Sequence, residues 1–296
     1  MFSNKEYLKF IDSSKNRGLD IVCTNVIETI GHTYAKVGNI MLVNSNNEFT
    51  GVLGSPALHS KILEFSKEVL ESKENIYYEN KPKDKNSGHG ISKYIIEPFY
   101  FSDEYGALGG ALKNFGKTLV RNITNKSFEI IDDKKDIKLE NNCFYQTIEK
   151  PYSLLIFGTG AHVSSLITMA NIMGWETTVI DLEIREEFVN DADKIIKLNK
   201  LDDILEMNLY SYNASVILSH SPKTDDTYLE ALLKSNVEYI GVLGNKKNMK
   251  KKREQFNLHN DKRFFAPVGL DIGGITHESI ALSICSQIEA RKNKKI

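Results

Sequence analysis

A glycine pair at residues 158 and 160 is the strongest chemical signal in this chain. An apolar, strand-like segment, Leu154–Phe157, runs into Gly158-Thr159-Gly160, and a helical pattern begins directly afterwards. Glycines at these positions permit a tight turn and let a pyrophosphate approach the backbone at the helix N-terminus. A second strand-like segment ends at Asp181, where a carboxylate can accept a hydrogen bond from a ribose hydroxyl. We predict that Gly158, Thr159, Gly160 and Asp181 bind a dinucleotide.

This dinucleotide fingerprint is incomplete at its third position, where Val163 replaces the usual glycine or alanine. Strand, glycine pair, helix, strand and acid nevertheless follow one another in the expected order. The alternative is that the glycines only allow the helix to pack on the strand and that no nucleotide binds.

A histidine ends a further strand-like segment of the same half. Residues 214–219 are followed by His220, and Asp225 and Asp226 come shortly after it. In a doubly wound sheet the carboxyl ends of the strands line the ligand crevice. His220 is therefore a candidate ligand contact or general base, and Asp225 or Asp226 could orient its imidazole. A structural histidine bonded to nearby backbone is equally compatible with the sequence.

Two later glycine-containing segments are weaker candidates. Gly244 ends another strand-like segment and precedes Lys246 and Lys247, which could meet an anionic ligand or belong to the solvated face of a basic helix. A glycine-rich loop at 267–276 contains Asp271, which could touch a ligand or serve only the loop. The histidines show no metal-binding spacing, so we expect no metal site.

These residues need a framework that brings strand ends together. Strand-like segments at 154–157, 177–180, 215–218 and 239–243 alternate with helical segments at 162–173, 226–235, 246–256 and 277–290. This alternation predicts an α/β fold, a Rossmann-like doubly wound parallel sheet over residues 151–296.

The first half of the chain has a different pattern. Helical spacing at 4–15 and 57–71 and strand-like segments at 20–28, 39–43, 49–53 and 94–96 predict a smaller α+β domain over residues 1–150. Leu108, Leu112, Phe115 and Leu119 share one helical stripe. Residues 122–150 are polar with short apolar islands, and we interpret them as the linker region, containing one or two short strands.

Composition excludes several classes of protein. The formal net charge is −1, which argues against nucleic acid as a partner. No apolar segment is long enough to cross a membrane, and residues 1–10 have no signal-peptide core. Three cysteines, Cys23, Cys143 and Cys285, form no Cys-x-x-Cys pair and cannot build a disulfide framework. We therefore expect a cytoplasmic protein.

The C-terminal half resembles the Rossmann domain of the XdhC/CoxI family, the accessory factors of xanthine dehydrogenase and CO dehydrogenase. The resemblance covers some 140 residues and rests on the following segments: 156–166, 174–181, 219–225, 239–244, 266–273 and 278–284.

The N-terminal half is similar to the same family, with departures. The family's glycines, its Met-Leu-Val strand and the Glu-Pro ending of a later strand are kept in residues 28–31, 38–43 and 95–98. The family's Gly-Gly-Cys-Leu-Glu motif is replaced by residues 54–59, with Ala57 in the cysteine position and His59 in the acidic one. A second family cysteine aligns near Gly88-His89 and is absent, and Ala161 stands where the family often has histidine.

The resemblance implies a chaperone rather than an enzyme. Such a protein binds the molybdenum cofactor transiently, as molybdopterin or its dinucleotide, promotes its sulfuration with a cysteine desulfurase, and delivers it to a molybdenum hydroxylase client. The alternatives are an NAD(P)-binding oxidoreductase and a nucleotide-sensing regulatory module, and a homodimer is compatible with each. Because this chain lacks the two family cysteines, it lacks the thiols that a thiol-dependent part of this role would use.

Overall fold

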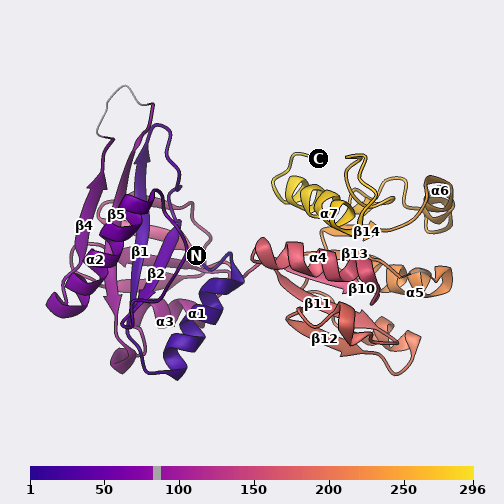
Figure 1. The fold of residues 1–296 in the computed structure, drawn as a ribbon, viewed down its shortest axis with the longest axis horizontal. Helices are drawn as coiled ribbons and strands as arrows, with labels where there is room; N and C mark the ends of the chain where they lie inside the picture. The colour runs from indigo at the N-terminus through magenta and orange to yellow at the C-terminus, as the bar shows by residue number, and fades with distance from the viewer. Residues whose placement is uncertain (83–87, 220) are drawn as a thin grey trace. The chain divides into compact units, whose positions relative to one another are not determined.

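The computed structural model describes residues 1–82, 88–219 and 221–296. The chain divides into two compact units, Met1–Lys150 and Pro151–Ile296, which we call the N-terminal and C-terminal units (Figure 1).

A wholly parallel six-stranded sheet forms the centre of the C-terminal unit. Its strands are β10 (Ser153–Phe157), β11 (Glu176–Asp181), β12 (Lys194–Lys197), β13 (Ala214–Ile217), β14 (Tyr239–Val242) and β15 (Phe264–Phe265). They lie in the order β12-β11-β10-β13-β14-β15, with every neighbouring pair parallel. This is the strand order of dinucleotide-binding folds, in which the chain reverses its direction of winding between β10 and β13. The predicted fold class is confirmed.

Helices cover both faces of this sheet (Figure 1). They are α4 (Ala161–Ile172), α5 (Pro222–Leu233), α6 (Lys246–Gln255) and α7 (His277–Lys292), with short 3-10 helices at Glu186–Phe188 and Leu201–Glu206. Because side chains alternate along a strand, Leu154 and Ile156 pack against α4 and α7. Leu155 and Phe157 face the other way, against α5 and α6.

The predicted strands and helices of this unit are present, with two strands missed. The missed strands are β12, which is short and largely exposed, and the two-residue β15. Helix α5 begins earlier than predicted, with Pro222 in its first turn, where the missing N–H of proline costs no hydrogen bond.

The N-terminal unit contains a five-stranded antiparallel sheet. Its order is β3 (Phe49–Thr50), β2 (Ile40–Asn44), β1 (Ile21–Ile30), β5 (Ile91–Phe99) and β4 (Ile76–Asn80). Helix α2 (Pro56–Ser72) packs on one face, against Val22 and Ile96. Helices α1 (Lys5–Asn16) and α3 (Gly106–Leu112) pack against the opposite face, where Ile21 and Cys23 are buried.

Residues 122–150, expected to be a linker with one or two short strands, contribute three strands to a second sheet, so the linker prediction is wrong. Strands β7 (Phe128–Ile131), β6 (Thr118–Asn122), β9 (Cys143–Thr147) and β8 (Lys138–Glu140) form a four-stranded antiparallel sheet in that order. Leu119 and Phe144 are fully buried. The segment contributes apolar core, so the N-terminal unit is not smaller than the C-terminal one.

Two other local predictions are corrected. The helical stripe from Leu108 does not reach Leu119, because α3 ends at Leu112, Gly116 turns the chain with φ of 86°, and Leu119 lies on β6. The strand expected at 49–53 stops at Thr50, directly before Gly51 with φ of 87°. A 3-10 helix, Phe101–Asp103, precedes α3.

A buried ion pair joins the two sheets of the N-terminal unit. Arg121 of β6 donates to the carboxylate of Glu97 on β5, and both side chains are at least nine-tenths buried. Arg121 also donates to Oε1 of Gln146 at 3.2 Å. Burial raises the pKa of Glu97, and the neighbouring guanidinium opposes that rise. The pair fixes how the sheets meet, because an unpaired charge there would be costly.

Candidate functional site

A crevice opens at the carboxyl edge of the parallel sheet, where the winding reverses. It encloses about 410 Å³ and is lined by residues from three strand ends: Gly158, Thr159, Gly160, Asp181, Leu182, Glu183, Arg185, Leu218, Ser219, Ser221 and Thr224. Ligands of doubly wound folds bind at this place. The four residues predicted to bind a dinucleotide thus lie together.

The two glycines have different structural roles. Gly158 has φ of 114°, and a Cβ atom there would lie 3.0 Å from the carbonyl of Leu218. Gly160 is the N-cap residue of α4 with φ of −99°, and no heavy atom lies within 4 Å of where its Cβ would be. Gly158 is therefore required by the fold, whereas Gly160 leaves open space in front of the N-terminus of α4, where an anion is favoured.

Asp181 is held at the end of β11 by neighbours from two other segments. Its Oδ1 accepts hydrogen bonds from the backbone N–H of Leu182 at 2.8 Å and from the Tyr228 hydroxyl at 3.1 Å. Thr159 is buried, and its hydroxyl donates to the carbonyl of Glu183 at 2.8 Å, with Oδ2 of Asp181 at 3.5 Å. Thr159 thus links the glycine loop to the end of β11.

Tyr228 lies beneath the carboxylate of Asp181. It is fully buried on α5 and stacks on Phe157, with ring centroids 4.3 Å apart. Burial raises the pKa of Tyr228, and the negative charge of Asp181 raises it further. The phenol therefore stays protonated and keeps donating to Asp181.

A second pocket, of about 440 Å³, adjoins the crevice and shares Ser219 with it. Asp225 and Gly244, both predicted site residues, line it together with Asn245, Asp226 and residues of α6. The Ser219 hydroxyl donates to Asp225, which is buried. His220 lies outside the described residues, so its predicted role stays a prediction.

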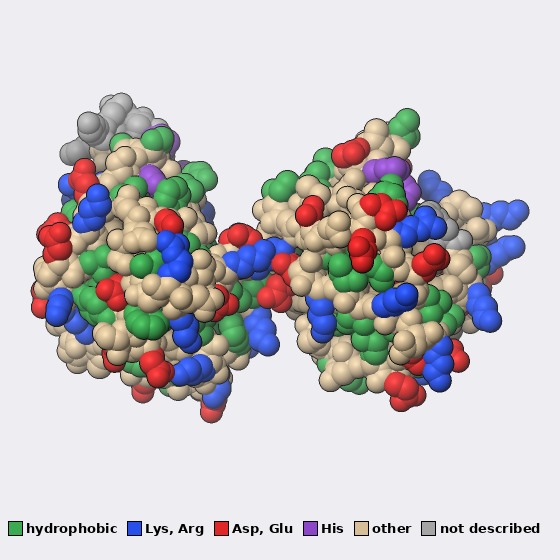
Figure 2. Space-filling view, turned by 60° about the horizontal axis from the view of Figure 1, so that its bottom comes forward, with side chains coloured by type: hydrophobic (Ala, Val, Ile, Leu, Met, Phe, Trp, Pro, Cys, Tyr) green, Lys and Arg blue, Asp and Glu red, His purple; other side chains and the backbone are tan. Residues whose placement is uncertain are grey.

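Other predicted candidates are not brought to these pockets. Lys246 and Lys247 are exposed on α6, at the end of the unit where lysine and arginine side chains gather (Figure 2). This placement favours the solvated basic helix. Asp271 is exposed in the loop before α7 and lines neither pocket.

Several crevice residues escaped the sequence analysis. No sequence motif marks Tyr228 as a site residue, because it reaches Asp181 only through the packing of α5. Arg185 could have been noticed from its position four residues after Asp181, where an arginine can meet a ribose phosphate. Ser221 and Thr224 line the crevice from the start of α5.

The cysteines do not gather at the crevice. Cys23 and Cys285 are buried, and burial raises the pKa of each thiol to about 12. Cys143 is half-buried on β9. In the part of the chain that the structure describes, no group of three or more His, Cys, Asp or Glu side chains could hold a metal ion.

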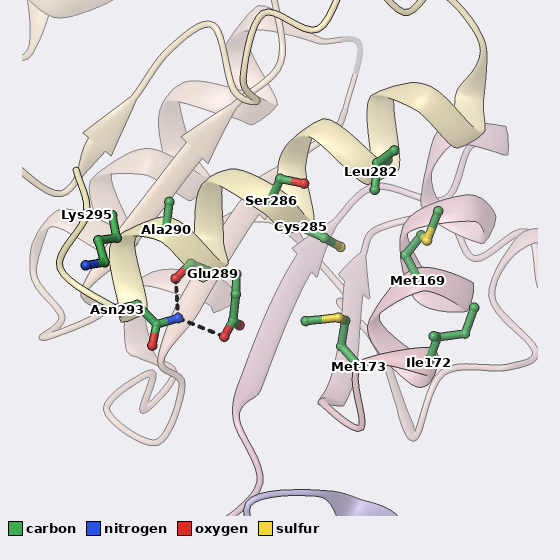
Figure 3. Close-up of a pocket in the computed structure, with 10 residues that line it drawn as sticks. All are labelled: Met169, Ile172, Met173, Leu282, Cys285, Ser286, Glu289, Ala290, Asn293 and Lys295. Carbon is green, nitrogen blue, oxygen red and sulfur yellow. Dashed lines mark hydrogen bonds between the residues drawn. The ribbon is translucent and has the colours of Figure 1, made fainter. Parts of the chain in front are cut away.

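A further groove lies away from the crevice, along α4 and α7. It encloses about 600 Å³, and Figure 3 shows Met169, Met173, Leu282 and Cys285 facing it from the two helices. Glu289, bonded to Asn293, lies toward one end. The groove is mainly apolar, with Ser286, Asn293 and Lys295 among its polar lining residues.

No helix among the described residues is long and apolar enough to span a membrane.

Comparison with known proteins supports this description. The model of the XdhC Rossmann domain matches residues 154–288, and the model of the XdhC and CoxI family matches residues 15–78. A curated relative from Bacillus subtilis (strain 168), a probable subunit of xanthine dehydrogenase, is 30% identical over 150 residues. The matched stretch is 50% of this chain and 45% of that protein, so the match spans less than half of the relative.

A solved structure shares the whole fold. A xanthine dehydrogenase from Bacillus halodurans superimposes with a TM-score of 0.82 at 21% identity, covering 100% of this chain and 97% of that one. The two family models match separate parts of the chain, and the C-terminal match coincides with the doubly wound sheet. The resemblance to this family that we inferred from the sequence is therefore confirmed. The chain belongs to the XdhC and CoxI family.

Proposed function

We propose that this protein is an accessory factor of a molybdenum hydroxylase of the xanthine dehydrogenase type. In this role it binds the molybdenum cofactor as cargo, in its pterin or pterin dinucleotide form, and delivers it to the hydroxylase. The family supports the accessory role. The names of the relatives point to xanthine dehydrogenase as the client.

The observation that carries the binding part is the pairing of Gly160 with Asp181 in one crevice. Gly160 leaves room for a pyrophosphate at the N-terminus of α4, and Asp181 offers an acceptor to a ribose hydroxyl. A pterin dinucleotide carries both groups. The adjoining pocket, with Asp225, Asp226 and Asn245, offers polar partners for the rest of the ligand.

The described crevice residues offer groups that can bind and orient a ligand. They offer backbone N–H groups, one held carboxylate, serine and threonine hydroxyls and the Arg185 guanidinium. These groups suit a bound pterin dinucleotide, and the same glycines and Asp181 would also suit NAD.

We further propose that this chain does not carry sulfur itself. Cys23 and Cys285 are buried thiols with raised pKa values, and thiolates are the reactive form of cysteine. Sulfuration would then rest on a partner such as a cysteine desulfurase. The triple variant Cys23→Ser, Cys143→Ser, Cys285→Ser, if folded, should activate an apo-hydroxylase as the wild type does. Loss of activation that follows Cys143 alone would contradict this proposal.

The binding proposal is tested with the full chain. Purified protein is oxidised and its extract examined for pterin fluorescence, and binding of a pterin dinucleotide, NAD and NADP is compared by calorimetry. We expect pterin in the extract and tighter binding of the pterin dinucleotide than of either nicotinamide cofactor. Delivery is measured as activation of apo-hydroxylase, with Gly160→Val as the binding-deficient control. Turnover of NAD(P)H, with no affinity for pterin, would overturn the proposal in favour of an oxidoreductase.

A further inference from the structure

A further cavity lies in the N-terminal unit. It encloses about 500 Å³ and is lined by four stretches that are distant in sequence: His32, Thr33 and Tyr34; Leu53, Gly54, Ser55 and Leu58; Asn80, Lys81 and Pro82; and His89, Gly90, Ser92 and Tyr94.

The close crossing of two backbone segments brings its histidines together. Beyond the last paired residues of β1 and β5, the N–H of Gly90 donates to the carbonyl of His32 at 2.6 Å. A Cβ atom at Gly90 would lie 2.1 Å from the carbonyl oxygen of Ile30, so only glycine permits this approach. His89, next to Gly90, is thereby held on the same side of the unit as His32.

The inner wall combines an apolar surface with hydroxyl groups. Leu53, Leu58 and Tyr94 are buried. Ser92 and Tyr94 lie two residues apart on β5 and therefore face the same side of the sheet. Ser55 caps α2, accepting a hydrogen bond from the N–H of Leu58 at 3.3 Å, which leaves its own hydroxyl proton for another acceptor. This wall suits a ligand with a flat apolar part and acceptor oxygens.

The charge of the lining is one-sided. Among its described residues, Lys81 is charged, His32 and His89 are titratable, and none is Asp or Glu. Within the part of the chain that the structure describes, Lys81 pairs with the carboxylate of Glu79. That pair is 65% and 34% exposed, so water screens it and the lysine can turn toward an anion at little cost.

We propose that this cavity binds a small organic phosphate, a phosphate monoester carried on a planar ring. Lys81, His32, His89 and the Ser55 hydroxyl supply donors from several directions, as a phosphate with three acceptor oxygens requires. Leu53, Leu58 and Tyr94 supply the surface for the ring. The volume is within the range of small-molecule sites.

Histidine NMR of the full chain tests the site directly. Protein labelled with ¹⁵N-histidine is titrated with phenyl phosphate, inorganic phosphate and benzyl alcohol, and the imidazole signals are assigned by substitution. We expect phenyl phosphate to shift the His32 and His89 signals saturably, inorganic phosphate to act more weakly, and benzyl alcohol to have little effect. Equal affinity for inorganic and phenyl phosphate would remove the ring from the site and overturn the proposal.

Matched variants separate the cavity from general charge effects. Lys81→Gln and His32→Asn should each weaken phenyl phosphate binding by about tenfold, the usual effect of losing a charge-assisted hydrogen bond. Lys67→Gln, on the exposed face of α2, and His259→Asn, in the C-terminal unit, should leave it unchanged. Gly160→Val should also bind phenyl phosphate normally, so failure at the crevice and failure here are distinguishable. Equal weakening by the Lys67 and Lys81 variants would show nonspecific attraction and contradict the site.

Discussion

The Tyr228 hydroxyl donates a hydrogen bond of 3.1 Å to Oδ1 of Asp181, so a residue of α5 holds the carboxylate at the end of β11. Oδ1 also accepts the N–H of Leu182. One oxygen of Asp181 is thus bound by two donors from the protein. This arrangement orients the carboxylate before any ligand arrives, which reduces the entropy lost on binding.

Tyr228→Phe should therefore weaken nucleotide binding without unfolding the protein. The substitution removes the donor and keeps the stacking of the ring on Phe157. We expect affinity for a pterin dinucleotide to fall by about threefold to tenfold, corresponding to one hydrogen bond. Tyr210→Phe, at an exposed tyrosine, is the control. If calorimetry finds Tyr228→Phe unchanged while Asp181→Ala loses binding, Asp181 does not depend on this contact.

The two crevice glycines should respond to substitution in opposite ways. Gly160→Val places a side chain in open space, so the free energy of unfolding should change by no more than about 1 kcal/mol while nucleotide binding is lost. Gly158→Ala forces a Cβ against Leu218 at φ of 114° and should cost about 1–3 kcal/mol or more. Urea denaturation and calorimetry measure the two effects. Normal nucleotide binding by folded Gly160→Val would exclude the crevice as the site.

The Arg121–Glu97 pair should matter far more to stability than an exposed pair. Arg121→Met leaves the carboxylate of Glu97 buried without its cation and should cost about 3–5 kcal/mol. Adding Glu97→Leu should recover much of that loss, because the remaining charge is removed. Arg17→Met breaks the exposed pair with Glu48 and should cost less than about 1 kcal/mol. Equal losses for the single and double variants would mean that packing, not charge, dominates.

The three thiols should differ in reactivity. Cys143 is half-buried, whereas Cys23 and Cys285 are buried. With a thiol reagent near pH 8, we expect one cysteine to react in the native protein and all three after denaturation. Cys143→Ser should abolish the native reaction. Rapid native labelling of Cys285 would show that a reagent in the groove along α4 and α7 reaches its buried thiol.

Alkaline pH should destabilise the protein through its buried thiols. Folding raises the pKa of Cys285 from 9.0 to about 12, so between these values the unfolded chain loses a proton that the folded chain keeps. This group's stabilising contribution is therefore complete below pH 9 and is lost as the pH rises toward 12. Cys285→Ala should show a shallower loss of stability over that range than the wild type. An unchanged slope would mean that other groups, such as the buried tyrosines, account for the loss.

The sequence alone was sufficient to predict the parallel sheet and the crevice at its carboxyl edge. Parallel strands buried on both faces are continuous apolar segments, and the helices between them show a different period, so each element is visible locally. The glycine pair and Asp181 directly follow such strands, and the carboxyl ends of parallel strands meet at one edge. Their meeting therefore follows from the order of the elements.

The tertiary structure alone decided which distant segments complete each site. Tyr228 reaches Asp181 through helix packing. Strands β6 to β9 are three to five residues long and are stabilised by pairing with one another, so each leaves little periodic signal of its own. The altered family motifs at 54–59 and 88–89 both contribute residues to the cavity of the N-terminal unit. Local sequence encodes the period and the turns of each element, whereas contacts between elements depend on packing energies summed over many residues, which no single segment contains.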